Sequence, residues 1–310
     1  MIAVLAGGVG AARFLAGLVR TVPAAEVTAI VNTGDDTVLH GLHVSPDLDT
    51  VTYSLAGAVN PATGWGLDGE SFVAMDALDR YGAPTWFRLG DRDLATHLYR
   101  TGRLAAGARL SDVAREVAAS WSVAVRLLPM SDDPVRTRIE LATGEEIEFQ
   151  EYFVKLRHAV AVRAVRFAGI EHAEPAPGVV DALRDGALVV VAPSNPVVSI
   201  GPILAVRGVG DVLAARRERV VAISPIVAGA ALKGPADRLL VELGEEPSVV
   251  GVARRLREVA GTLVVDEADR DLAGAVEAEG MRCVVTSTVM HDADAAARLA
   301  RDVLDACGAS

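Results

Sequence analysis

A glycine-rich turn directly after the first apolar run is the feature that most limits the fold of this chain. Residues 2–5 (IAVL) are followed by Gly7, Gly8 and Gly10, and apolar side chains then recur at helical spacing over residues 14–19. This order predicts a buried strand, a tight turn and a helix. Small residues at such a turn let the backbone approach a phosphate, and the helix start offers free N–H groups.

The glycine turn completes neither of the two common nucleotide-binding motifs. Counted from Gly8, a G-x-G-x-x-G sequence would place its third glycine at Arg13, and no Gly-Lys-Ser/Thr ending follows. Arg13 can instead give a bidentate contact to a phosphate. The turn alone is equally consistent with a tight strand–helix connection that binds nothing.

Acidic residues follow the second apolar run. Residues 27–31 (VTAIV) predict a strand that ends in Asn32-Thr33-Gly34-Asp35-Asp36, and Asp47 and Asp49 come shortly afterwards. Polar groups at the carboxyl ends of parallel strands meet at one edge of the sheet, so we expect these carboxylates beside the glycine turn. They suit Mg²⁺, or a general base toward a hydroxyl nucleophile. A helix cap at Asp49 and a turn role for Asp36 are the simpler alternatives.

Two later polar segments also follow predicted strands. Ser194, Asn195 and Ser199 come after the apolar run 187–192 and suit a nucleobase or a ribose, although an ordinary Asx-Pro turn is the simpler alternative. Lys233 comes after the run 220–223 and can neutralise a diphosphate, or it can belong to a solvated helix start. The parallel arrangement of the two segments indicates that both line one cleft.

Charged residues and histidines lie between these segments. Arg88 or Asp91 is expected to close the cleft wall, while capping of the following helix is the default role of Asp91 and Asp93. His40 and His43 can complete a metal site, but we favour loop positions for both.

The remaining chain predicts an α/β fold with a smaller insertion. We expect a Rossmann-like parallel sheet with flanking helices in residues 1–130 and 181–310, and a small α+β insertion in residues 131–180. Within the insertion, the alternating runs around Thr143-Gly144 predict a β-hairpin. Further predicted strands are 122–128, 137–141, 146–149, 160–167, 263–265 and 283–286, and predicted helices are 50–58, 71–81, 93–101 and 110–119.

Composition excludes several classes of protein. The chain has 30 Lys+Arg against 41 Asp+Glu, a net charge of −11, which argues against a nucleic-acid partner. Its two cysteines cannot form a disulfide framework or a Cys-rich zinc site. The first residues lack the basic region of a signal peptide, and no run is long enough for a membrane span, so we expect a cytoplasmic protein without a membrane partner.

Seven segments then stand in a characteristic order. They are LAGGVGAARFL (5–15), NTGDD (32–36), SPDLDTV (45–51), RLGDRDLATH (88–97), EYFVK (151–155), PSNPVVSIGPIL (193–204) and SPIVAGAALKGPADR (224–238). Together they resemble the 2-phospho-L-lactate transferase family of deazaflavin coenzyme biosynthesis. The Ala/Arg/Val-rich composition is similar to the actinobacterial branch, in which the activated acid is phosphoenolpyruvate.

The resemblance implies a Mg²⁺-dependent homodimer with a core α/β domain and a small domain. It implies that the terminal ribityl hydroxyl of hydroxy-deazariboflavin (Fo) attacks a guanylyl-activated three-carbon acid at the phosphorus on the acid side, and that GMP leaves. No Ser-His-Asp set or cysteine nucleophile is evident, so direct transfer without a covalent intermediate is the simpler hypothesis. Such a transfer depends mainly on positioning and on charge neutralisation at the diphosphate.

The resemblance also assigns residues. It places the metal foremost at Asp35 and Asp47, with Asp36 and Asp49 close behind, and matches Gly7–Gly10 to the phosphate loop. It places Ser194 and Asn195 in the loop that faces the guanosine. With the interpretation of the residues themselves, the expected site has Asp35, Asp36 and Asp47 as catalytic residues, Asp35, Asp47 and Asp49 as metal ligands, and Gly7, Gly8, Gly10, Arg13, Thr33, Arg88, Ser194, Asn195, Ser199 and Lys233 as binding residues.

Two other functions remain open from the sequence. A non-catalytic, nucleotide-sugar-binding regulator of the same fold would share the glycine loop, but anion binding alone gains nothing from four carboxylates. A Rossmann oxidoreductase could use Asp35 as its ribose-binding acid. Arg13 in place of the third glycine disfavours that enzyme class, and a test of NADH binding would separate it.

Overall fold

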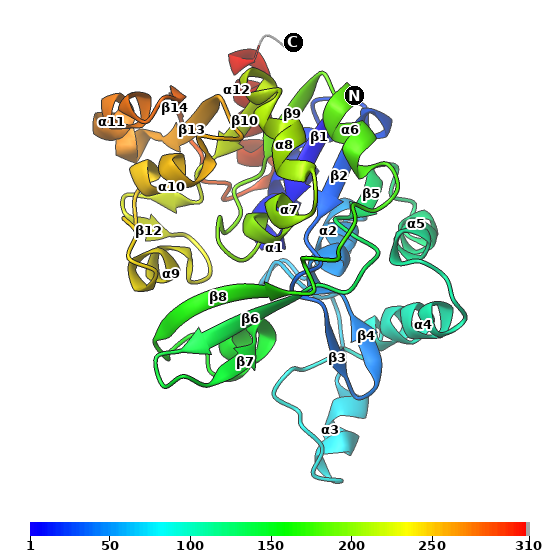
Figure 1. The fold of residues 1–310 in the computed structure, drawn as a ribbon. Helices are drawn as coiled ribbons and strands as arrows, with labels where there is room; N and C mark the ends of the chain where they lie inside the picture. The colour runs from blue at the N-terminus through cyan, green and yellow to red at the C-terminus, as the bar shows by residue number, and fades with distance from the viewer. Residues whose placement is uncertain (308–310) are drawn as a thin grey trace.

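The computed structural model describes residues 1–307, which form an α/β fold around one parallel sheet (Figure 1). Its seven strands lie in the order β14-β13-β10-β9-β1-β2-β5, and every neighbouring pair is parallel. The bounds are β1 Ile2–Ala6, β2 Val27–Val31, β5 Arg126–Pro129, β9 Leu188–Val191, β10 Val220–Ile223, β13 Thr262–Asp266 and β14 Arg282–Thr286. All seven carboxyl ends therefore meet at one edge, and the predicted fold class is confirmed.

Alternate residues of β1 face two layers of helices. Val4 packs in a buried cluster with Phe14 and Leu299 on one face, and Leu5 packs in a second cluster with Val179 and Ile203 on the other. The first face carries α1 Gly8–Leu18, α2 Pro46–Leu55, α5 Leu110–Ser120 and α12 Ala293–Ala306. The second carries α6 Val179–Asp185, α7 Ile200–Ala205, α8 Val209–Ala214, α9 Ala236–Glu242, α10 Val249–Leu256 and α11 Ala273–Ala278.

A separate three-stranded antiparallel sheet lies beside the carboxyl edge of the main sheet (Figure 1). It consists of β6 Arg136–Leu141, β7 Glu146–Glu148 and β8 Val162–Ala168, in the order β7-β6-β8. Ile139 pairs with Ile147, so the predicted hairpin around Thr143-Gly144 is confirmed. Both isoleucines are buried in the same apolar cluster as Leu5. The division of the chain into two domains stays a prediction.

Further elements lie toward the carboxyl edge of the sheet (Figure 1). They are two short hairpins, β3 Thr37–Leu39 with β4 Leu42–Val44 and β11 Ile226–Val227 with β12 Ala230–Ala231, and the helices α3 Val73–Asp79 and α4 Asp93–Ala105. The sequence patterns did not predict either hairpin. Within residues 1–307, no helix has both the length and the apolar character that a membrane span requires.

One predicted strand and one predicted helix near the site begin at residues other than those expected. The strand expected at 122–128 covers only Arg126–Pro129, because Ser122 has a positive φ of 55° and belongs to the turn that ends α5. The helix expected at 50–58 begins four residues earlier, at Pro46, where proline suits a first helical turn. Asp47 and Asp49 therefore lie inside the first turn of α2 rather than in a loop before it.

Candidate active site

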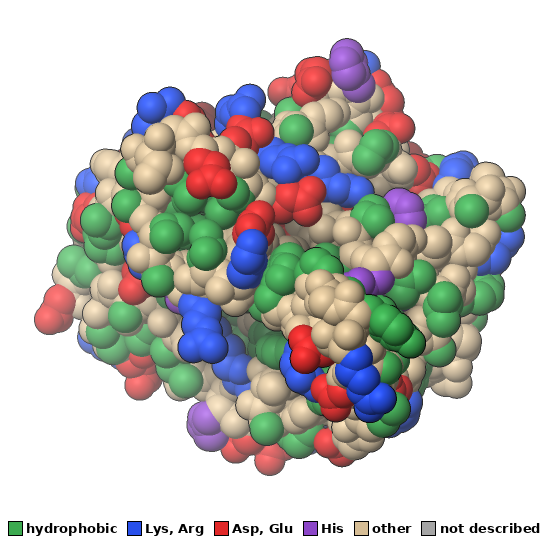
Figure 2. All heavy atoms as spheres, turned by 90° about the horizontal axis from the view of Figure 1, so that it is seen from below, with side chains coloured by type: hydrophobic (Ala, Val, Ile, Leu, Met, Phe, Trp, Pro, Cys, Tyr) green, Lys and Arg blue, Asp and Glu red, His purple; other side chains and the backbone are tan. Residues whose placement is uncertain are grey.

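A cavity of about 730 Å³ opens at the carboxyl edge of the main sheet. Figure 2 shows this face of the molecule, where charged side chains gather around the hollow. Most of the predicted site residues line the cavity: Gly7, Gly8, Gly10, Arg13, Asp35, Asp47, Asp49, Arg88, Ser194, Asn195, Ser199 and Lys233. Thr33 is buried and Asp36 is half-buried, and neither lines the cavity.

The glycine turn is locked to the loop after β9. The hydroxyl of Ser194 donates to the Gly7 carbonyl at 2.8 Å and accepts from the Gly7 N–H at 3.3 Å. Gly10 approaches this loop so closely that a Cβ there would lie 2.2 Å from the carbonyl oxygen of Pro193. The glycines are therefore needed where two strand-end loops meet, and the N-terminus of α1 faces the cavity.

Asp35 and Asp47 form an acidic pair that has no ion pair with any cationic side chain of residues 1–307. Asp47 accepts hydrogen bonds of 2.9 Å from the Gly8 N–H and from the Asn32 side chain. Burial raises the pKa of Asp47 to about 6, and burial with the nearby Asp47 carboxylate raises the pKa of Asp35 well above its usual value. Oδ1 of Asp35 is buried and accepts no hydrogen bond. An orphaned carboxylate oxygen beside a second buried carboxylate fits a hard divalent cation.

The other two predicted acids are engaged elsewhere. Asp36 accepts a 2.6 Å hydrogen bond from Ser45, and burial raises its pKa to about 7. Asp49 pairs with the guanidinium of Arg100, which is 2% exposed. The four carboxylates thus divide into a pair facing the cavity without a counter-ion and a pair held near Arg100.

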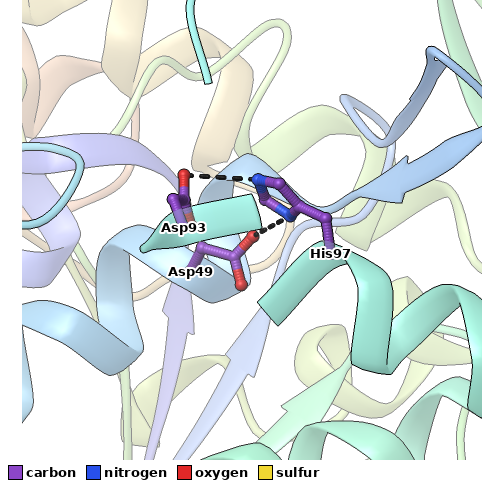
Figure 3. Close-up of side chains that lie close together, drawn as sticks. All are labelled: Asp49, Asp93 and His97. Carbon is purple, nitrogen blue, oxygen red and sulfur yellow. Dashed lines mark ion pairs between the residues drawn. The ribbon is translucent and has the colours of Figure 1, made fainter. Parts of the chain in front are cut away.

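Asp49 also belongs to a cluster with Asp93 and His97 on the cavity wall (Figure 3). Nδ1 of His97 lies 3.7 Å from Asp49, and Nε2 lies 3.2 Å from Asp93. Tyr53 donates a 2.6 Å hydrogen bond to Asp93. In residues 1–307 this is the one His and acid group compact enough for a metal ion, but the guanidinium of Arg100 already contacts two of its members, Asp49 and His97, the latter at 3.3 Å from Nδ1. The sequence patterns did not assign His97 a role.

The acidic residues that precede α3 and α4 each cap the other helix. Asp91 accepts from the backbone N–H groups of Val73 and Ala74, each at 2.9 Å, and so caps α3 rather than the helix that follows it. Glu70 accepts from the N–H groups of Arg92 and Asp93 and caps α4 in turn. Since capping groups act in space, a carboxylate can serve a helix far from it in sequence.

Arg88 lies on the cavity wall, as expected. Its guanidinium pairs with Asp76 at 2.8 Å and lies 4.7 Å from the ring centre of Phe72. His40 lies in the turn of the β3–β4 hairpin, as the loop interpretation predicts, whereas that interpretation is wrong for His43, which lies in β4 and pairs with Val38. Neither histidine lines the cavity.

Two cationic side chains lie close together beside the glycine turn. Arg13 donates to the Met290 carbonyl at 3.4 Å, and Lys233 donates to the Thr63 carbonyl at 3.0 Å. Burial and the charge of Arg13 lower the pKa of Lys233. Both cations line the cavity, so they can neutralise a bound anion.

Two groups of lining residues escaped the sequence prediction. Phe149 and Phe153 stack with ring centres 5.4 Å apart and bring aromatic surface to the cavity from the helical segment directly after β7. Residues 288–291 also line it. Both groups could have been predicted from the sequence. Phe153 lies in the EYFVK segment, and residues 288–291 follow an apolar run that forms a parallel strand.

Comparison with known proteins decides the family. The model of the 2-phospho-L-lactate transferase CofD family matches residues 2–306. The chain belongs to this family. A phosphoenolpyruvate transferase from Streptomyces griseus is 48% identical, over 98% of this chain and 97% of the relative. The resemblance found in the sequence is thus confirmed, and the CofD-family chain is a transferase.

Further relatives agree along the whole chain. Phosphoenolpyruvate transferases from Streptomyces coelicolor and Mycolicibacterium smegmatis are 45% and 40% identical, and cover 98% and 100% of this chain and 97% and 99% of their own. A crystal structure of a UPF0052 family member from Bacillus halodurans superposes with a TM-score of 0.63 at 17% identity, over 98% of both chains. That structure shows the shared fold alone.

Proposed function

We propose that this CofD-family chain transfers the phosphoenolpyruvyl group from a guanylyl diphosphate donor to the terminal ribityl hydroxyl of Fo, and that GMP leaves. The observation that carries the proposal is the composition of the cavity wall. One cavity combines a helix N-terminus, an unneutralised acidic pair, two cations and an aromatic surface. The names of relatives that are 40–48% identical support phosphoenolpyruvate as the acid.

We assign the donor to the side of the cavity formed by the glycine turn. The first turn of α1 offers backbone N–H groups and the positive end of the helix dipole to a diphosphate. Arg13 and Lys233 supply positive charge to the same group. Ser194 and Ser199 line the cavity directly beside the turn. The Ser194 hydroxyl is bonded to Gly7 and fixes the loop, so we assign the Ser199 hydroxyl to the nucleoside. A diphosphate fits this set because each phosphate meets separate donors.

We propose that Mg²⁺ is held by Asp35 and Asp47, which fit it by their shared burial and by the orphaned Oδ1 of Asp35. When bound, the ion neutralises charge at the phosphoryl group. Asn32 and the Gly8 N–H orient Asp47 for this role. A role for Asp49 as a third ligand stays a prediction, and in this structure its carboxylate is occupied by Arg100.

The acceptor is proposed to lie against Phe149 and Phe153. A flat aromatic ring system gains from offset or parallel stacking on such side chains, and Gln150 between them lines the same wall. This placement leaves the ribityl hydroxyl free to reach the phosphorus.

We also propose a cytoplasmic homodimer. Apolar side chains that α3 and α4 leave exposed, Val73 and Leu98 at 70% and 60%, support a partner surface there.

The deciding experiment incubates the protein with Fo, Mg²⁺ and each of the two guanylylated acids in turn. We expect GMP and a phosphodiester-linked acid on Fo, with the phosphoenolpyruvyl donor preferred. Addition of EDTA is the matched control and should stop GMP release. The proposal is wrong if neither donor yields GMP in the presence of Fo and Mg²⁺.

A further inference from the structure

One buried carboxylate at the end of β13 holds the segment after β14 in place by hydrogen bonds. Asp266 is 8% exposed, and its Oδ2 accepts from both the N–H and the hydroxyl of Thr288, at 2.8 and 3.0 Å. Its Oδ1 accepts from the Ala268 N–H at 3.0 Å and so caps the helical turn at Glu267–Leu272. One oxygen thus bonds within its own loop, and the other bonds the segment that follows the neighbouring strand β14.

These hydrogen bonds keep Asp266 ionised despite its burial. Burial alone raises the pKa of a carboxyl group, but the N–H groups of Ala268, Thr288 and Val289 and the Thr288 hydroxyl outweigh it and hold the pKa below its usual value. A charged acceptor makes stronger hydrogen bonds than a neutral one. The start of the 288–291 segment is therefore rigidly placed.

The fastened segment reaches the phosphate loop. Residues 288–291 line the cavity, and the Met290 carbonyl accepts from Nη1 of Arg13 at 3.4 Å. Arg13 stands close enough to Lys233 to lower the pKa of that amine, so the two cations repel each other. Each cation donates to a backbone carbonyl, which opposes the repulsion. Arg13 donates to Met290, and Lys233 donates to Thr63.

We propose that Asp266 is a positioning residue for the donor: through Thr288 and the Met290 carbonyl it holds Arg13 in place to bind the diphosphate. The inference rests on the proposed function in one respect, the identity of the donor as a nucleoside diphosphate. Asp266 does not line the cavity and does not touch the donor itself. Asp266 acts on Arg13 through Thr288 and Met290 of the segment after β14.

Asp266→Asn is a selective probe because the two oxygens have separate partners. The Asn carbonyl can keep the cap on Ala268, while its NH₂ group then faces the Thr288 N–H, donor against donor. Thr288→Val removes only the hydroxyl contact and keeps the side-chain shape. Thr286→Val is the matched control, since Thr286, the last residue of β14, donates a 2.6 Å hydrogen bond to Asp302 at an exposed position.

The experiment measures GDP binding by calorimetry, steady-state KM values for donor and acceptor, and thermal unfolding of each variant. For Asp266→Asn we expect the GDP Kd and the donor KM to rise about tenfold, as misplacement of a binding group does. The KM for Fo and kcat at saturating donor should stay as in the wild type. Thr288→Val should give a smaller change in the same direction, and Thr286→Val none.

Each outcome bears on the inference. An unchanged GDP Kd in Asp266→Asn overturns it, as does an equal rise in the KM values of donor and acceptor. Should Asp266→Asn fail to fold, an unchanged GDP Kd in Thr288→Val overturns it instead. A wild-type protein that binds GDP but transfers nothing refutes only the proposed function, whereas one that binds no GDP refutes the inference too.

Discussion

Arg100 and Asp49 form a buried ion pair beneath the cavity, with Nη1 of Arg100 3.1 Å from Oδ2 of Asp49 and Nη2 in contact with Oδ1. The same guanidinium contacts His97 and the His43 carbonyl, both at 3.3 Å. It also favours the charged form of Asp36. Arg100 therefore compensates Asp49 and Asp36, whereas Asp35 and Asp47 have no such partner among residues 1–307.

The unneutralised pair should be essential for transfer but not for folding. We expect Asp35→Asn and Asp47→Asn each to lower kcat by at least about a hundredfold, because charge neutralisation at the diphosphate is lost. The thermal midpoint of the metal-free protein should stay constant or rise, since each substitution removes a carboxyl whose ionised form burial disfavours. Normal turnover of Fo by both variants would refute the metal assignment.

Breaking the Arg100–Asp49 pair on one side should destabilise the fold strongly. Arg100→Met leaves a buried carboxylate without its partner, which costs about 3–5 kcal/mol in such pairs. The double variant Asp49→Asn/Arg100→Met should recover much of this loss, because the buried Asp49 carboxylate is then no longer left without a partner. Urea unfolding of the wild type, both single variants and the double variant measures the coupling. Additive single effects would show that the pair is not coupled.

The metal-free protein should lose stability as the pH rises from about 4 to 7. Burial raises the pKa of Asp47 to about 6 and that of Asp36 to about 7. In this window the folded state still holds protons that the unfolded state has released, so each group lowers stability by up to about 1.4 kcal/mol per pH unit.

Mg²⁺ should oppose this trend, because it binds the deprotonated carboxylates and is bound more tightly as the pH rises. Urea unfolding in EDTA and in Mg²⁺, at several pH values, tests both statements. A stability in EDTA that increases steadily over the window would contradict the shifted pKa values.

Two glycines should respond oppositely to alanine. Gly10→Ala forces a Cβ against the Pro193 carbonyl and should cost about 1–3 kcal/mol while raising the donor KM. Gly102→Ala, inside α4 with nothing within 4 Å of the new Cβ, should stabilise the fold by about 0.5–1 kcal/mol. Thermal unfolding and donor KM separate the two. Equal effects would mean that the contact at Gly10 does not constrain the phosphate loop.

Loss of the aromatic wall should affect the acceptor alone. Phe153→Ala removes the ring that stacks on Phe149, so the KM for Fo should rise by about three- to tenfold, the value of one stacking contact. The donor KM should stay unchanged. Steady-state kinetics with each substrate varied in turn measures the split, and an effect on the donor alone would place the acceptor elsewhere.

Sequence patterns predicted the main sheet because its strands are short apolar runs flanked by glycines and helices. The runs at residues 2–5, 27–31 and 220–223 each became a strand of that sheet. The short hairpins could not be predicted in this way. Residues 37–44 carry no clear alternation, and their pairing depends on a turn in which His40 takes a positive φ of 52°.

For the site, the sequence alone determined which strand ends carry chemistry, since the carboxyl edge of a parallel sheet gathers whatever follows each strand. It also gave the family, through the order of seven segments. Only the tertiary structure decided which carboxylates have a counter-ion, because Arg100 lies on another helix, 51 residues beyond Asp49. It likewise decided that Asp91 and Glu70 cap each other's helices and that Asp266 fastens the segment beside Arg13. Hydrogen bonds and ion pairs depend on distance in space, and a sequence does not record that distance.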